Sequence, residues 1–128
     1  SLEKVPFIRY QTDASVSNII ENWCAEHFEE PPIVAMDVNS MSTCRHFVRA
    51  GLGWSILTYM GLGSCKDKDI YVSPLRSKDG NYITRDTNMV YAKDATNLIA
   101  VKTFIEYVRN YYKEHTVVDD SIFREYKA

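Results

Sequence analysis

The residues whose types and spacing could support chemistry follow an apolar run at 33–38. Asn39, Ser40 and Ser42 come directly after this run, where a helix is expected to begin. In parallel α/β sheets, ligands bind beyond the carboxyl ends of strands, where free N–H groups and the helix dipole favour carboxylates and other anions. The sequence therefore predicts a ligand site here; the simpler interpretation is one N-cap residue beside solvated neighbours.

Catalytic motifs are not evident. Gly53-Trp54-Ser55 begins like a nucleophile elbow, but Leu57 occupies the position of the required second glycine. Gly51-Leu52-Gly53 follows an expected helix and precedes an expected strand, the reverse of a phosphate-binding loop, so it indicates a helix end. We predict no enzyme, no metal site and no cofactor.

The three cysteines, Cys24, Cys44 and Cys65, cannot all pair with one another, and their wide spacing matches no zinc motif. We interpret them as reduced thiols of a cytoplasmic protein. Cys44 has the spacing of a buried helix position. An alternative function, a small α/β enzyme with Cys44 or Cys65 as nucleophile, is testable by thiol reactivity.

The composition is that of one soluble globular domain. The chain has 128 residues, a formal net charge of −2 and 45% hydrophobic residues. A pI near 5.9 argues against nucleic-acid binding by these residues alone. No apolar stretch is long enough to span a membrane, and Ser1–Lys4 shows no feature of a signal peptide.

Strands and helices alternate in the first half of the chain. The expected elements are a strand at 6–10, a helix at 16–27, a strand at 33–38, a helix from 41 to 50 and a strand at 54–58. Asp13, Ser15 or Ser17 could cap the first helix. The apolar run at 33–38 predicts a strand covered on both faces, and Arg45 is expected to point outward. This order favours a right-handed parallel crossover and an α/β fold.

The second half is expected to be looser. Loops surround a short strand at 70–72, and residues 81–93 are predicted to be extended. Thr96 or Asp94 is expected to cap a long helix over 96–114, and residues 116–128 are expected to form a tail.

One segment, from Arg45 to Leu57, resembles the regulatory region of LysR-type transcriptional regulators. Its sequence is Arg-His-Phe-Val-Arg-Ala-Gly-Leu-Gly-Trp-Ser-Ile-Leu, with Pro6-Phe7-Ile8 before it and Met89–Asp94 after it in matching order. The resemblance implies one Rossmann-like lobe of a type 2 periplasmic-binding-protein-like fold, with a mixed, mostly parallel sheet flanked by helices.

The resemblance further implies a domain plan. Residues 4–115 would form the second lobe, with 87–115 as a return segment, while the DNA-binding domain lies outside this sequence. Whether helix 96–114 packs on this lobe or on the absent one stays open.

The implied effector site lies in a cleft between two lobes and includes Asn39, Ser40 and Ser42. Thr58, Tyr59 and Tyr10 would face the same cleft. The sequence Tyr59-Met60-Gly61 departs from the Leu-Pro that the family often shows here, which affects the expected shape of the cleft wall.

The function implied by the resemblance is ligand sensing. A small-molecule effector would change the angle between lobes and so the arrangement of DNA-binding domains in a homo-oligomer of the parent protein. DNA would be bound only through the absent N-terminal domain. The alternative is a fragment of a periplasmic-type solute-binding protein, which shares the fold.

Overall fold

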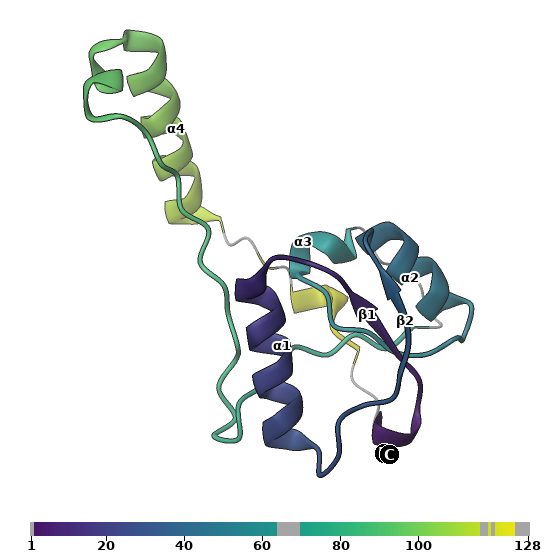
Figure 1. Cartoon of the computed structure of the whole chain (residues 1–128). Helices are drawn as coiled ribbons and strands as arrows, with labels where there is room; N and C mark the ends of the chain where they lie inside the picture. The colour runs from purple at the N-terminus through teal and green to yellow at the C-terminus, as the bar shows by residue number, and fades with distance from the viewer. Residues whose placement is uncertain (1, 64–69, 116–117, 119, 125–128) are drawn as a thin grey trace. The chain divides into compact units, whose positions relative to one another are not determined.

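The structure is a computed structural model that describes residues 2–63, 70–115, 118 and 120–124 (Figure 1). The chain divides into two compact units. Residues 1–83 and 122–128 form the first unit, and residues 84–121 form the second. Cys65 and the charged run 66–69 lie outside the described residues. Within the described part, no helix has the length and apolarity needed to cross a membrane.

The first unit is built around strand β1 (Phe7–Tyr10), which has a parallel neighbour on each side. Strand β2 (Val34–Val38) pairs with β1 so that Tyr10 lies opposite Val38. On the other side, Phe7 forms a parallel bridge with Trp54, and the Ile8 N–H donates to the Trp54 carbonyl oxygen at 2.9 Å. The α/β fold expected from the sequence is confirmed.

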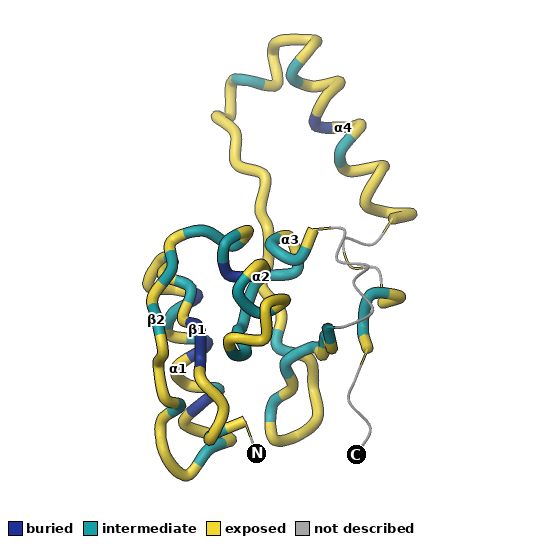
Figure 2. Tube along the Cα trace, turned by 90° about the vertical axis from the view of Figure 1, so that its right-hand side faces the viewer, coloured by how far each residue is buried: buried dark blue, intermediate teal, exposed yellow. Residues whose placement is uncertain are grey.

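Two helices cover opposite faces of β1. Helix α1 (Ala14–His27) packs Val16, Ile20 and Cys24 against Phe7. The next residue, Ile8, points to the other face, where Cys44 of helix α2 (Met41–Arg49) lies beside it; both Ile8 and Cys44 are fully buried. Figure 2 shows these buried positions on α1, β1 and α2.

Local sequence signals explain where these helices begin and end. The Asp13 side chain accepts a hydrogen bond from the Val16 N–H and so caps α1, as one of the three expected caps. Helix α2 ends before Gly51, whose φ of +78° lies in the left-handed region, as predicted. The Pro-Pro pair at 31–32 separates α1 from β2.

The prediction that the strand at 33–38 is covered on both faces is wrong for this unit. Val34, Ala35 and Asp37 of β2 are exposed. The reason is that β2 is an edge strand here, with β1 on one side and no second neighbour among the described residues.

Two further strand predictions are only partly right. In the predicted strand at 54–58, only Trp54 takes part in a bridge, and these residues are half-buried rather than buried. In the predicted strand at 70–72, only Val72 pairs, in an antiparallel bridge with Arg124. Each segment forms a single β-bridge to one partner residue, so neither segment forms a β-ladder.

Two details around α2 also differ from expectation. A one-turn helix, α3 (Tyr59–Leu62), occupies a region expected to be a loop. Arg45 does not point outward: it is half-buried, and its Nη1 donates to the Leu62 carbonyl oxygen at 2.8 Å. The carbonyl at the end of α3 attracts the guanidinium inward.

The second unit contains an extended segment, a 3-10 turn at Lys93–Asn97 and helix α4 (Ile99–Glu114). A long helix was predicted here, but its predicted start at residue 96 and its predicted cap, Thr96 or Asp94, are wrong. Leu98 is the N-cap and provides no side-chain hydrogen bond, because the 3-10 turn occupies residues 93–97. The domain boundaries at 115 and 116 stay a prediction, although residues 120–122 form a short 3-10 turn.

Candidate functional site

The candidate site lies at the edge of the sheet where the parallel strands end. Tyr10 ends β1 and Asn39 follows β2, and the two strand ends are joined by the Gln11 N–H, which donates to the Val38 carbonyl oxygen at 2.8 Å. The segment that begins at Trp54 runs parallel to β1 and leads to Thr58. Three chain segments therefore reach the same edge, as the rule for ligand sites in α/β sheets requires.

Ser40 is the N-cap of α2. Its Oγ accepts a hydrogen bond from the Thr43 N–H at 3.3 Å, and its backbone lies in the extended region. Ser40 is therefore the N-cap residue among the three predicted positions. Its neighbours Asn39 and Ser42 are exposed, so their side chains are accessible to a ligand.

Thr58 repeats this arrangement at the start of α3. Its Oγ1 accepts from the Gly61 N–H at 3.3 Å and also lies 3.6 Å from the Sδ of Met41, the first residue of α2. The starts of α2 and α3 are therefore in contact, and the residue that Thr58 meets, Met41, lies between Ser40 and Ser42 in the sequence. Tyr59 follows on α3 and is half-buried.

Tyr10 lies beside two hollows. One has a volume of about 470 Å³, lies between α1 and the strands, and is lined by apolar residues such as Phe7 and Ile20 together with charged ones such as Glu21. The other, of about 320 Å³, is lined by polar residues between β1 and α1. The other five predicted site residues line neither hollow. At this edge, Asn39 and Ser42 are exposed and Thr58 is half-buried.

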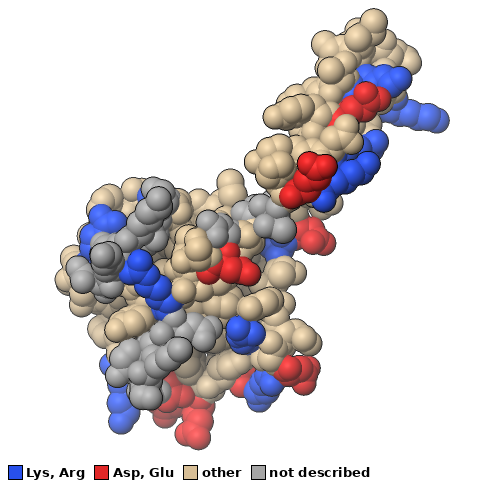
Figure 3. All heavy atoms as spheres, turned by 180° about the vertical axis from the view of Figure 1, so that it is seen from behind, with Lys and Arg blue, Asp and Glu red and all other residues tan. Residues whose placement is uncertain are grey.

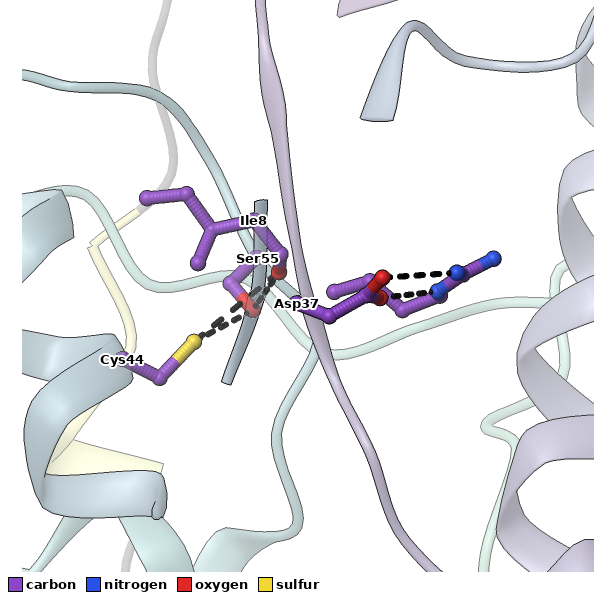
Figure 4. Close-up of polar contacts among 5 residues, drawn as sticks. Ile8, Asp37, Cys44 and Ser55 are labelled. Atoms are coloured by element: carbon purple, nitrogen blue, oxygen red, sulfur yellow. Dashed lines mark hydrogen bonds and ion pairs between the residues drawn. The ribbon is translucent and has the colours of Figure 1, made fainter. Parts of the chain in front are cut away.

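A buried thiol connects α2 to β1 (Figure 4). The Cys44 Sγ lies 2.9 Å from the Ser55 Oγ, and the Ser55 hydroxyl donates to the Ile8 carbonyl oxygen at 2.7 Å. Burial raises the pKa of the Cys44 thiol, more than the Ser55 hydrogen bond lowers it. Burial of the thiol and a raised pKa both disfavour the thiolate, which is the nucleophilic form of cysteine.

An ion pair joins the two strands on the face of β1 that also bears Phe7 (Figure 4). Arg9 and Asp37 lie opposite each other, with the Arg9 Nη2 donating to the Asp37 Oδ2 at 3.0 Å and Nε to Oδ1. The hydrogen bond from Arg9 lowers the pKa of Asp37. The pair is half-exposed, so it aligns the strands more than it stabilises them.

No cluster of three potential metal ligands occurs among the described residues. On the face in Figure 3, basic and acidic side chains are interspersed.

Sequence reasoning missed Met41 and Arg45 as contacts of α3. Their spacing of four residues on α2 is the signal that could have indicated a shared partner.

Comparison with known proteins identifies relatives. The chain is 35% identical over 105 residues to a Bacillus subtilis (strain 168) protein named the uncharacterized HTH-type transcriptional regulator YraN. It is 28% identical over 105 residues to the uncharacterized HTH-type transcriptional regulator YkuM of the same organism. Each match covers 82% of this chain and 36% or 35% of the relative, so the chain spans about a third of their length.

A family model covers most of the chain. The model of the LysR substrate binding domain matches residues 1–113, a range that includes β1, both helices beside it, α3 and nearly all of α4. This domain implies a type 2 periplasmic-binding-protein-like fold, in agreement with the parallel strands and flanking helices of the first unit. The chain therefore belongs to the LysR family of transcriptional regulators and carries their substrate-binding domain.

Proposed function

We propose that this chain is the effector-sensing part of a longer LysR-type regulator and that it binds a small molecule at Asn39, Ser40 and Ser42, with Thr58, Tyr59 and Tyr10 nearby. The observation that carries the proposal is the meeting of three parallel segments at one edge of the sheet. The contact between Thr58 and Met41 brings the starts of α2 and α3 together at that edge.

The chemistry of the edge favours an anionic group. The Ser40 side chain and carbonyl satisfy the N–H groups of Thr43 and Cys44. The N–H groups of Met41 and Ser42, at the first two positions of α2, have no intrahelical acceptor, so they can donate to a carboxylate at the positive end of the helix dipole. The exposed Asn39 amide and Ser42 hydroxyl add neutral contacts.

The proposed mechanism is a shift between conformations of a longer protein. An effector that contacts this lobe and an opposing one favours a single angle between them. That angle would control how DNA-binding domains are arranged in a cytoplasmic homo-oligomer, with DNA bound outside this chain. The return segment 87–115 would lead the chain back to the other lobe.

The test is a thermal-shift screen of the longer protein against succinate, benzoate and glutamate. A probe at about 100 times its Kd should stabilise the protein by about 2.7 kcal/mol. Asn39→Ala and Ser42→Ala should abolish the shift, while Ser15→Ala, an exposed serine in α1, should preserve it. If all three variants respond equally, the site lies elsewhere.

The isolated 128-residue chain supplies a sharper version of the same test. It offers one wall of the cleft, so it should bind the active probe weakly or not detectably. A Kd in the low micromolar range, measured by calorimetry on this chain alone, would contradict the proposed role of a second lobe.

A further inference from the structure

Helix α3 is held against α2 at both of its ends. At its start, the Thr58 Oγ1 donates to the Met41 Sδ at 3.6 Å. At its end, the Leu62 carbonyl oxygen accepts from the Arg45 Nη1 at 2.8 Å. The two contacts on α2 come from residues four apart, which lie one turn apart on the same helix face.

The dimensions of the two helices agree with this arrangement. Four residues of an α-helix rise by about 6 Å, which is close to the length of a four-residue helix such as α3. Met41 and Arg45 can therefore reach the two ends of α3 at the same time.

Two glycines permit the close contact. A Cβ on Gly61 would lie 2.0 Å from the Met41 Sδ, and a Cβ on Gly63 would lie 2.5 Å from the Arg45 Nη1. In both cases the nearest atom belongs to the far part of a flexible side chain. An added methyl group would thus displace Met41 or Arg45 rather than the backbone of α2.

Arg45 is not placed as an ordinary surface cation. It is half-buried, and its Nε is buried without a hydrogen-bond partner among the described residues. A buried donor that lacks a partner costs free energy, which a solvent-exposed rotamer would avoid. The contact with the end of α3 offsets this cost and accounts for the inward orientation.

We propose that Met41 and Arg45 are positioning residues of the effector site. They hold α3 against α2 and thereby fix Thr58 and Tyr59 beside the start of α2, where Asn39 and Ser42 lie. The consequence for ligand binding rests on the proposed function. The contact itself is a property of the unliganded chain and can be tested without a ligand.

The first experiment measures amide hydrogen exchange in this chain by NMR. The Gly61 N–H reports on α3, because it donates to both the carbonyl oxygen and the Oγ1 of Thr58. Arg45→Met removes the donor and should make exchange at Gly61 roughly tenfold faster. Arg45→Lys should restore part of the protection. Arg49→Met, one turn further along α2 and exposed, is the matched control.

Gly61→Ala distinguishes the effect of the Met41 contact on α3 from the effect of helix propensity. Alanine is the better helix former, so propensity alone predicts slower exchange in α3. Displacement of Met41 predicts faster exchange, and Met41→Ala in the otherwise wild-type chain should also make exchange faster, because it removes the contact with Thr58. Unchanged α1 amides establish that the fold is intact. Unaltered exchange in Arg45→Met, or slower exchange in Gly61→Ala, would overturn the inference.

The second experiment repeats the succinate, benzoate and glutamate screen with Arg45→Met in the longer protein. The midpoint without ligand should change little, while the Kd for the active probe should rise about tenfold. Arg45→Lys should recover part of this loss. If Arg45→Met binds as tightly as the wild type, the positioning role fails and the proposed function stands. If no probe raises the thermal midpoint of the wild type, the proposed function loses support. The hydrogen-exchange data then test by themselves whether Met41 and Arg45 hold α3 against α2.

Discussion

The two units of this chain place similar helices in different surroundings. Helix α1 buries Val16, Ile20 and Cys24 against a strand. Helix α4 is slightly longer, with 16 residues, yet only Ile105 is buried, while Phe104 and Tyr107 are 61% and 66% exposed. An apolar stripe thus predicts which face of a helix can pack, but it does not predict whether another element of the same unit covers that face.

The difference has a consequence for local stability. The first unit has a closed core between α1, β1 and α2, whereas the second has one buried apolar residue among its described positions. Regions with few buried contacts open at lower free energy. We therefore expect amides of α4 to exchange faster than those of β1 and α1.

The largest effect should follow from truncating the centre of the core. Ile8→Ala removes a fully buried side chain between α2 and the sheet, and should lower the free energy of unfolding by about 2–5 kcal/mol. Trp23 and Trp54 are the two tryptophans of the chain, and both lie in the first unit, so their fluorescence follows its unfolding.

The matched control is Ile99→Ala, at an isoleucine of α4 that is 84% exposed. Ile99→Ala should change the free energy of unfolding by no more than about 0.5 kcal/mol. Equal losses from the two substitutions would show that the two units do not differ in the way described.

A smaller effect should come from the helix caps. Asp13→Ala removes a cap hydrogen bond from α1 and should destabilise the first unit by about 1 kcal/mol.

Helix α4 lacks such a bond, since its N-cap is Leu98, with extended backbone and 63% exposure. Leu98→Asp should therefore slow amide exchange in α4 by severalfold. Faster exchange there would show that Leu98 contributes packing that outweighs a cap.

The sequence allowed the local features of the first unit to be predicted. A cap at Asp13 (one of three expected positions), a strand within 33–38 and the end of α2 before Gly51 each depend on neighbours within one or two turns. The exposure of β2 and the single bridge of Trp54 were not predicted, because they depend on which segments lie beside them.

The candidate site shows the same division. The position of Ser40 at the start of α2 follows from the local pattern of a strand followed by a helix. Helix α3 was missed because Gly61 and Gly63 are typical of loops. Their role depends on the approach of Met41 and Arg45, which the sequence does not encode locally.

The smallest predicted effect concerns the ion pair that joins β1 to β2. Hydrogen bonding to Arg9 lowers the pKa of Asp37 below its unfolded value near 4. A lowered pKa in the folded state means that the pair stabilises the first unit above that value, and that this contribution is lost as the pH falls through the folded pKa. Asp37→Asn should therefore lower the midpoint of tryptophan-detected unfolding slightly at pH 6. The difference from wild type should shrink as the pH approaches 3. Asp94→Asn, in the second unit, is the control and should leave this fluorescence transition unchanged at both pH values. A difference for Asp37→Asn that stays constant with pH would mean that the carboxylate charge is not what joins the two strands.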